Sequence, residues 1–287
     1  MTEIKIADCA GFCFGVERAE KIVFDTLQKY KKKIYTLGPL IHNPLVVKKL
    51  EETGVFAVDE NDIESLPDKA TLIIRSHGIE KNLKEILVKK GFNVVDATCP
   101  FVKKAKEVAE DFYNKGYEVL ILGDSNHPEV KGIHSYTDYK GKIIKNPESI
   151  NQIILNTDKK IGLIAQTTQN KETFVKCVEI LKNSNKQFEF FDTICSATQQ
   201  RQEAAIRLAR ESDVIIVIGG FNSANTKRLV EICSKICKNV LWIEKTEELE
   251  FEKLKKFKKI GITAGASTPI WSIEKTAESI KINLGEE

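Results

Sequence analysis

Residues 94–112 read VVDATCPFVKKAKEVAEDF, in which Cys99 separates a short apolar run from a stretch with apolar residues three and four positions apart. This pattern is typical of a β-strand that gives way to an amphipathic helix. The same pattern surrounds two other cysteines: Cys13 in DCAGFCFGVERAEKI (residues 8–22) and Cys195 in FFDTICSATQQRQEAAIRLA (residues 190–209). The sequence therefore predicts three strand-to-helix turns, each of which presents one thiol.

Each cysteine is followed by two further apolar strands that end in polar turns. The first turns are GPLIHNP, GDSNHPE and GGFNSAN, which place His42, His127 and Ser223 28 or 29 residues after the cysteine. The second turns are RSHG, AQTTQ and AGASTP, which place His77, Thr167 and Ser267 a further 35, 40 and 44 residues on. Any α/β protein repeats strands, turns and helices, but this shared spacing favours three related units.

The predicted fold class is α/β, with three related units and mainly parallel sheets. Continuous apolar strands such as VIIVIG alternate with helices, as in parallel sheets that are covered on both faces. The predicted units are residues 1–98, 99–194 and 195–287, the last ending in a helix. Ligands of such sheets collect at the carboxyl ends of the strands. We therefore expect the thiols and polar turns to line one crevice.

Composition bounds the possible partners and the compartment. Lysine and arginine total 44 against 41 acidic residues, so the net charge of +3 gives no case for binding nucleic acid or a membrane surface. The lysines are interpreted as a solvated surface. No leader peptide or membrane span is visible, and seven cysteines argue against a secreted disulfide framework. We therefore expect a cytoplasmic protein.

Thiolates at helix N-termini are suited to bind metal, because the helix dipole lowers the pKa of the thiol. Iron–sulfur clusters ordinarily have four cysteine ligands, so three ligands would leave one iron with an open position for substrate. Spacing alone equally allows zinc. Cys177, Cys233 and Cys237 are interpreted as packing residues, and Cys9 has no counterpart in the other units.

Three of the four histidines, His42, His77 and His127, fall in the repeated polar turns. The remaining turns offer the hydroxyl and amide groups of Thr167, Ser223, Asn225 and Ser267. Together with backbone N–H groups at helix starts, these side chains are suited to surround an anion such as phosphate. No nucleotide-binding glycine motif is present. Glu129 lies two residues after His127 and is a candidate proton donor.

These motifs together resemble the 4-hydroxy-3-methylbut-2-enyl diphosphate reductase family, the last enzymes of the methylerythritol phosphate route to isoprenoids. The resemblance covers essentially the whole chain through GFCFGV, LGPLIHNP, RSHG, DATCP, GDSNHPEV, QTT, DTIC, NSANT and TAGASTP. It implies a trefoil of three α/β units around a central [4Fe-4S] cluster, with one open iron position.

The resemblance also implies a role for each matched residue. Cys13, Cys99 and Cys195 would be the cluster ligands. The diphosphate pocket would consist of His42, His77, His127, Ser223, Asn225 and Ser267. Glu129 and Thr167, beside His127, would handle the substrate hydroxyl and its protons. Two residues depart from the family pattern: Phe14 stands where a small residue is expected, and Ala224 stands where a second serine is expected.

The implied reaction is a two-electron reduction that removes an allylic hydroxyl as water and yields isopentenyl and dimethylallyl diphosphates. The implied electron donor is a reduced ferredoxin or flavodoxin. Two alternatives remain on the residues alone. One is a zinc-dependent hydrolase of a phosphorylated metabolite, in which Glu129 activates water. The other is a non-catalytic iron–sulfur protein, which would need no anion pocket.

Overall fold

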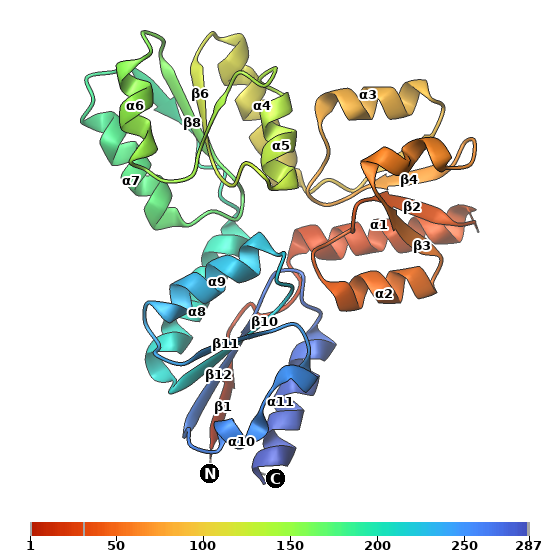
Figure 1. Cartoon of the computed structure of the whole chain (residues 1–287), viewed down its shortest axis with the longest axis vertical. Coiled ribbons are helices and arrows are strands. Elements are labelled where there is room, and N and C mark those ends of the chain that lie inside the picture. The colour runs from red at the N-terminus through yellow and green to blue at the C-terminus, as the bar shows by residue number, and fades with distance from the viewer. Residues whose placement is uncertain (1, 31, 286–287) are drawn as a thin grey trace. The chain divides into compact units, whose positions relative to one another are not determined.

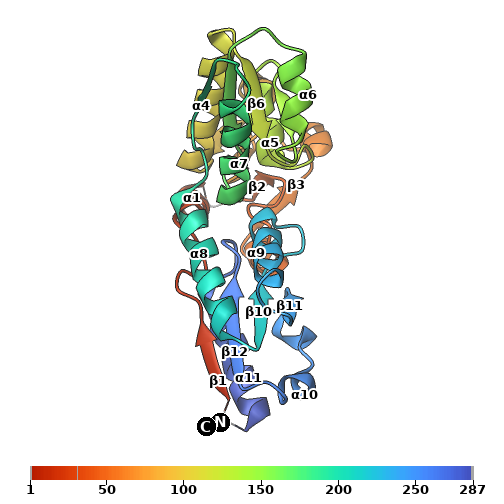
Figure 2. The ribbon, with the colours of Figure 1, turned by 90° about the vertical axis from the view of Figure 1, so that its left-hand side faces the viewer.

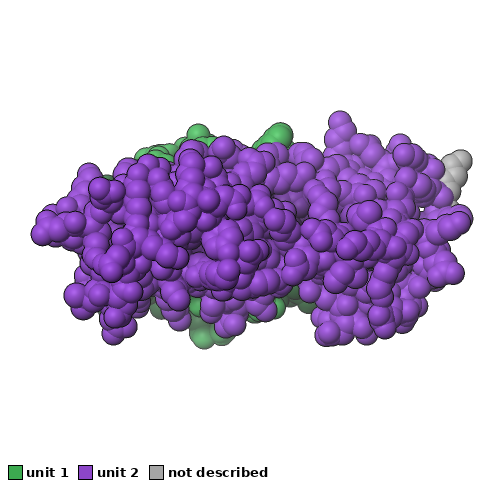
Figure 3. Space-filling view, turned by 90° about the horizontal axis from the view of Figure 1, so that it is seen from above, with its two compact units in different colours: residues 1–17, 41–50, 196–287 green, residues 18–40, 51–195 purple. Residues whose placement is uncertain are grey.

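The chain folds into three four-stranded parallel sheets with helices packed against them, as a computed structural model of residues 2–30 and 32–285 shows (Figure 1). This architecture confirms the predicted α/β class. The described residues form two compact units, coloured separately in Figure 3. Unit 1 comprises residues 1–17, 41–50 and 196–287, and unit 2 comprises residues 18–40 and 51–195.

The first sheet of unit 2 has the strand order β3-β2-β4-β5. Its strands are β2 (Ile34–Leu37), β3 (Val55–Val58), β4 (Thr71–Ile74) and β5 (Asn93–Asp96). The helices of this part of the chain are α1 (Phe14–Tyr30), α2 (Pro44–Glu52), the 3₁₀ helix η1 (Glu60–Ser65) and α3 (Lys81–Lys89). Every residue of β4 is buried, as expected for a central strand with helices on both faces.

The second sheet of unit 2 has the strand order β7-β6-β8-β9. Its strands are β6 (Glu118–Leu122), β7 (Lys142–Ile144), β8 (Ile161–Ala165) and β9 (Phe188–Phe190). The helices are α4 (Pro100–Asn114), α5 (Pro128–Ser135), α6 (Ser149–Leu155) and α7 (Lys171–Lys182). Apolar residues of α4 and α5 pack with Val119, Ile121 and Ile164, whereas those of α6 and α7 pack with Leu120, Leu122 and Leu163. Alternate residues of the same strands thus serve two cores, one on each face of the sheet.

The sheet of unit 1 has the strand order β1-β12-β10-β11. Its strands are β1 (Glu3–Ile6), β10 (Val214–Ile218), β11 (Val240–Ile243) and β12 (Lys259–Ala264). The helices are α8 (Ser196–Glu211), α9 (Ala224–Ser234), the 3₁₀ helix η2 (Thr246–Glu248), α10 (Phe251–Leu254) and α11 (Ile270–Leu284).

Strand β1 belongs to this last sheet, where Ile4 pairs with Ile260 and Ile6 with Ile262 (Figure 2). From the sequence, this strand is predicted to belong to the first unit, residues 1–98, whereas in the structure it pairs with β12. The physical reason is that parallel strands pair without regard to their distance along the chain. The unit boundaries at residues 98 and 194 stay a prediction.

The three sheets share one topology. Each has two central strands, β2 and β4, β6 and β8, or β10 and β12, and the direction of the strand order reverses between them. An edge strand, β5, β9 or β1, lies next to the second central strand. In open parallel sheets the point of reversal is where ligands bind, beyond the carboxyl ends of the strands. Among the helices of residues 2–30 and 32–285, none combines the length and the apolarity that crossing a membrane would require.

Candidate active site

The predicted thiols follow the edge strand of each sheet and directly precede a long helix. Cys13 precedes α1, Cys99 is the N-cap of α4, and Cys195 precedes α8. The backbone N–H of each cysteine donates to a carbonyl in the turn after the second central strand of the same sheet. These bonds are Cys13 to Ala266 (3.1 Å), Cys99 to Ser76 (2.9 Å) and Cys195 to Thr167 (3.0 Å). The same contact therefore joins thiol and polar turn in all three sheets.

Exposure separates these three cysteines from the others. Cys13, Cys99 and Cys195 are half-buried, and no disulfide joins cysteines within the described residues. Cys177 and Cys233 are fully buried, and burial raises the pKa of each thiol to about 12. These two thiols therefore stay protonated at neutral pH and act as packing residues, as predicted.

Cys237 and Cys9 also lie outside the repeated pattern. Cys237 is buried in the same apolar cluster as Cys233. Cys9 is exposed and lies in a turn with a φ of 63°. The half-buried position at a helix start is thus restricted to the three predicted ligands, and that position suits a thiolate that binds a metal cluster.

Unit 2 brings Glu129 and Thr167 into direct contact. Glu129 lies in the first turn of α5, after β6, and Thr167 lies in the turn after β8. One carboxyl oxygen of Glu129 accepts from the backbone N–H of Thr167 at 2.6 Å, and the other accepts from the Thr167 hydroxyl at 2.9 Å. Only 1% of Glu129 is exposed, and 5% of Thr167. The predicted pair is therefore an assembled, dry carboxyl–hydroxyl site.

Burial raises the pKa of the Glu129 carboxyl above its ordinary value of 4.5, because the charged form is taken out of water. The two hydrogen bonds from Thr167 and the charge of Lys106 oppose that shift. A carboxyl held in this way is able to carry a proton at a higher pH than one on the surface. It is therefore suited to act as a general acid.

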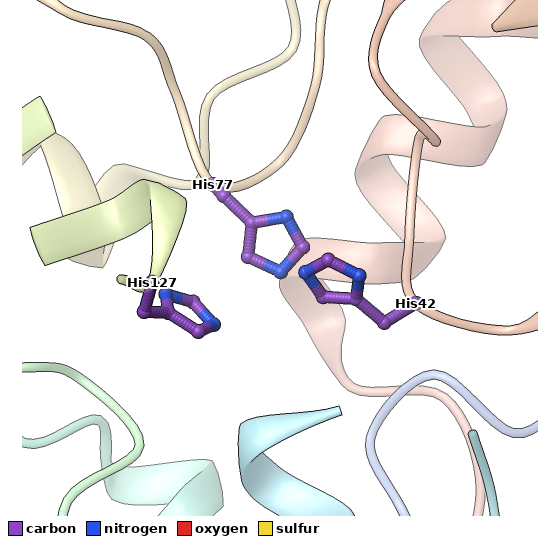
Figure 4. Close-up of side chains that lie close together, drawn as sticks. All are labelled: His42, His77 and His127. Atoms are coloured by element: carbon purple, nitrogen blue, oxygen red, sulfur yellow. The ribbon is translucent and has the colours of Figure 1, made fainter. Parts of the chain in front are cut away.

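His77 and His127 belong to the same unit as this pair. His77 lies in the loop after β4, and His127 is the N-cap of α5, where its Nδ1 accepts from the backbone N–H of Glu129 at 3.2 Å (Figure 4). The two imidazole rings are 5.5 Å apart in a T-shaped arrangement. Two of the predicted histidines thus lie beside one another, next to the start of the helix that carries Glu129.

Unit 1 brings the predicted Ser223 and Asn225 to the start of α9. The Ser223 hydroxyl caps this helix by accepting from the backbone N–H of Thr226 at 3.3 Å. Asn225 is only 5% exposed, yet neither its amide nitrogen nor its amide oxygen has a hydrogen-bond partner. A buried amide without partners is costly, so this side chain is suited to receive a polar ligand.

His42 and Ser267 also meet within unit 1. The Ser267 hydroxyl donates to the His42 carbonyl at 3.3 Å, and the Asn43 side-chain amide donates to the Ser267 carbonyl at 2.9 Å. Gly220 lies so close that a Cβ there would be 2.4 Å from the His42 carbonyl oxygen. The turns after β10 and β12 are thus joined to the residues around His42, and the absence of a side chain at Gly220 permits the contact.

The structure therefore assembles the predicted residues in two groups. Unit 2 holds Cys99, Cys195, His77, His127, Glu129 and Thr167, and unit 1 holds Cys13, His42, Ser223, Asn225 and Ser267. That both groups line one crevice stays a prediction. Of the two departures from the family pattern, Phe14 is 60% exposed at the start of α1, and Ala224 is the first residue of α9.

Two residues at the site were missed in the sequence. Asn43 is 4% exposed, and its side chain also accepts from the backbone N–H groups of Leu45 and Val46. Its position before Pro44 is a helix N-cap signal that would have found it. Lys106 is 5% exposed and does not belong to the solvated surface to which the lysines were assigned. No sequence signal distinguishes it from the neighbouring lysines of α4.

Comparison with known proteins gives matches over the full chain. A family model described as LytB protein matches residues 4–281. The chain is 48% identical over 286 residues to 4-hydroxy-3-methylbut-2-enyl diphosphate reductase of Caldanaerobacter subterraneus subsp. tengcongensis, with 99% of each chain covered. It is 46% identical over 272 residues to the enzyme of the same name from Clostridioides difficile, with 95% and 96% covered.

Two solved structures are similar along nearly the whole chain. One is the E-1-hydroxy-2-methyl-but-2-enyl-4-diphosphate reductase of Plasmodium falciparum, with a TM-score of 0.92, 31% identity, and 98% and 88% of the two chains covered. The other is (E)-4-hydroxy-3-methyl-but-2-enyl diphosphate reductase, described as the terminal enzyme of the non-mevalonate pathway, with a TM-score of 0.71, 43% identity, and 98% and 100% covered. The similarity thus extends far beyond the motifs around the cysteines.

Proposed function

Because the chain belongs to the LytB family, we propose that it catalyses the reductive dehydroxylation of 4-hydroxy-3-methylbut-2-enyl diphosphate, as the names of its relatives indicate. The products would be isopentenyl and dimethylallyl diphosphates, at the last step of the methylerythritol phosphate pathway. The observation that carries the proposal is the buried Glu129–Thr167 pair, since removal of a hydroxyl group as water requires a positioned proton source.

Members of this family are iron–sulfur proteins. We propose a [4Fe-4S] cluster with Cys13, Cys99 and Cys195 as its three ligands, because only these cysteines are half-buried at the start of a long helix. When bound, the cluster would pass the two electrons from the donor to the substrate and would offer one iron without a protein ligand.

The diphosphate would be bound by the polar turns: His42, His77, His127, Ser223, Asn225 and Ser267. The unpartnered Asn225 amide supports this role, because phosphate oxygens would accept from its NH₂ group. Few lysines or arginines accompany the histidines, so much of the positive charge would depend on histidine protonation. An unperturbed histidine changes charge near pH ~6.5, which makes diphosphate affinity sensitive to pH.

Glu129 and Thr167 would act at the hydroxyl end of the substrate. The overall change consumes two electrons and two protons: the C–O bond breaks, one proton leaves with the hydroxyl as water, and the other forms a C–H bond. The protonated Glu129 carboxyl would deliver a proton to the departing hydroxyl, and Thr167 would orient both the carboxyl and the substrate. Their burial excludes water that would compete for that proton.

The electrons would come from a reduced ferredoxin or flavodoxin. The cytoplasm is the proposed compartment, because it keeps cysteine thiols reduced and available for the cluster.

The test is anaerobic turnover of the reconstituted protein with 4-hydroxy-3-methylbut-2-enyl diphosphate and a reduced one-electron dye. We expect the two five-carbon diphosphates as products, with two equivalents of dye oxidised per substrate. Release of phosphate or pyrophosphate without dye oxidation would instead identify a hydrolase. Tight iron and sulfide binding with no conversion of substrate would identify a non-catalytic iron–sulfur protein.

A further inference from the structure

Lys106 is a buried ammonium group next to the proposed acid. It lies on α4, the helix that begins directly after Cys99, and only 5% of the residue is exposed. Its Nζ donates to the Ile79 carbonyl at 2.7 Å and lies 5.4 Å from the centre of the Tyr136 ring. Burial of a charged ammonium group costs free energy unless hydrogen bonds or an opposite charge compensate for the lost water. The buried position of Lys106 therefore requires an explanation.

Two glycines leave room for this ammonium. A Cβ at Gly78 would lie 2.5 Å from Nζ, and a Cβ at Gly132 would lie 3.2 Å from it. Gly78 directly follows His77, and Gly132 lies three residues after Glu129 in α5. The ammonium thus occupies the space between the turn that presents His77 and the helix that presents Glu129.

The charge of Lys106 acts on Glu129. It opposes the upward shift of the Glu129 pKa, and Glu129 in turn favours the charged form of Lys106. Burial lowers the pKa of Lys106 to about 8, so the group is mostly charged at neutral pH. Other charged or titratable groups also act on these two residues or lie beside them. They are Asp96 at the end of β5, Lys84 on α3, Lys103 on α4, Tyr136 after α5, and His127 at the start of α5.

We propose that Lys106 is a positioning residue for Glu129, whose buried positive charge keeps that carboxyl able to release its proton to the substrate. Burial alone would make Glu129 a weak acid, and the Thr167 hydrogen bonds and the Lys106 charge counteract this effect. An acid works best when its proton is neither lost to solvent nor held too tightly at the working pH. Lys106 touches no proposed reacting atom and acts through Glu129.

A cavity of about 260 Å³ lies beside Lys106. Its walls include Lys84, Asp96, Lys103, Lys106 and Tyr136. Among these residues, Asp96 favours the charged form of Lys106, whereas Lys84 and Lys103 oppose it. The site therefore combines a buried carboxyl with a buried cation that donates to a backbone carbonyl.

The inference rests on the proposed function of Glu129, so its test includes a readout that needs no turnover. That readout is infrared titration of the protonated carboxyl band in the reconstituted full chain, identified as the band that Glu129→Gln removes. Lys106→Gln removes the charge but keeps a side-chain N–H donor, and the band should persist to a higher pH than in the wild type. Lys106→Met should shift it in the same direction.

Two matched variants isolate the charge. Lys106→Arg keeps a positive charge at the site and should titrate close to the wild type. Lys104→Met removes an exposed lysine two residues earlier on the same helix and should leave the band unchanged. In steady-state assays the alkaline limb of kcat should move upward in Lys106→Gln by the same interval as the band, and it should not move in Lys104→Met.

An unchanged band in well-folded Lys106→Gln and Lys106→Met would overturn the inference. An equal shift in Lys104→Met would overturn it too, because any lysine of α4 would then have the same effect. Full turnover in Glu129→Gln would refute the proposed acid instead, and the infrared comparison would still decide whether Lys106 acts on Glu129. A failure of the inference about Lys106 can therefore be distinguished from a failure of the proposed acid role of Glu129.

Discussion

Glu129 is the residue whose environment differs most from that of an ordinary glutamate. Its carboxyl is fully enclosed, accepts two hydrogen bonds from Thr167, and has a raised pKa because burial disfavours the charged form. Structural carboxylates are usually solvated or paired with a cation at contact distance. The enclosed but still polar environment of Glu129 favours a role in proton delivery.

Glu129→Gln keeps the size and polarity of the side chain but is unable to supply a proton. General acid help is typically worth ~10²–10⁴-fold, so kcat should fall by at least about 100-fold. Iron content and substrate affinity should stay near those of the wild type, because the carboxyl acts in the transition state. Anaerobic steady-state kinetics with an artificial electron donor, beside an iron assay, provide the measurement. Near-normal kcat would exclude the acid role, and loss of iron would make Glu129 structural.

Glu129→Gln should also change how stability depends on pH. A carboxyl whose folded pKa is raised stabilises the fold fully below its unfolded value, and that contribution is lost as pH rises through the folded pKa. The stability of the variant relative to the wild type should therefore increase above pH ~4.5, by about 1.4 kcal/mol per pH unit until Glu129 ionises in the folded protein. Denaturant unfolding between pH 4 and 8 measures the difference. A difference that does not vary with pH would contradict the raised pKa.

Asn225 is buried without hydrogen-bond partners, which is a cost that a bound diphosphate would remove. Asn225→Leu should therefore weaken pyrophosphate binding by about tenfold or more, since hydrogen bonds to charged groups are worth ~1.5–3 kcal/mol. The ligand-free variant should be at least as stable as the wild type. Calorimetric titration and unfolding provide both values, with the exposed Asn283→Leu as control. Unchanged affinity would remove Asn225 from the pocket.

For individual residues, the sequence predicted which residues form the candidate site better than it predicted their burial and hydrogen bonds. His77, His127, Glu129 and Thr167 could be placed because turns after apolar strands are visible in the sequence. The burial of Lys106 was not predictable, because α4 carries three lysines between residues 103 and 106 and periodicity alone does not tell which one packs against another helix. The unpartnered state of Asn225 depends on tertiary neighbours and leaves no local signal.

Among the secondary-structure elements, the contact between α4 and β8 connects the turn that holds Cys99 to the turn that holds Thr167. Helix α4 starts at the Cys99 turn, and β8 ends two residues before Thr167. Gly162 in β8 lies against the ring of Phe112 in α4, where a Cβ would be 2.5 Å from a ring carbon. The helix approaches the strand this closely only because residue 162 has no side chain.

Gly162→Ala should force α4 away from the sheet. Overpacking of this kind typically costs ~1–3 kcal/mol, so the free energy of unfolding should fall by that amount. Iron content after reconstitution should fall as well, because Cys99 moves with the start of α4. Denaturant unfolding and an iron assay test both statements. Gly162→Ala combined with Phe112→Leu, which makes room, should recover part of the loss, and wild-type stability of the single variant would contradict the packing argument.

The element order was largely predictable because each sheet repeats a strand, a polar turn and a helix. The pairing of β1 with β12 was not, since 252 residues separate Ile6 from Lys259 and no local pattern encodes a partner so far away. Once β1 is placed, the three sheets become equivalent. Each then delivers its thiol from the edge strand beside its second polar turn.

In the molecule as a whole, three equivalent thiols are the proposed ligands of the cluster. The amide of each proposed ligand donates to the turn after a second central strand, whereas Cys177 is buried within a core cluster of unit 2. A cluster with three ligands from three sheets requires all of them, because removal of one would leave two irons without a protein ligand. Cys177 is a matched control, since it has the same side chain in the same protein without the helix-start position.

The most direct test is the iron and acid-labile sulfide content of four serine variants after anaerobic reconstitution, with the fold checked by circular dichroism. We predict that Cys13→Ser, Cys99→Ser and Cys195→Ser each lose most of the iron, the sulfide and the reductase activity. Cys177→Ser should retain all three. Loss of iron from Cys177→Ser, together with a wild-type iron content in a folded Cys99→Ser, would contradict the account.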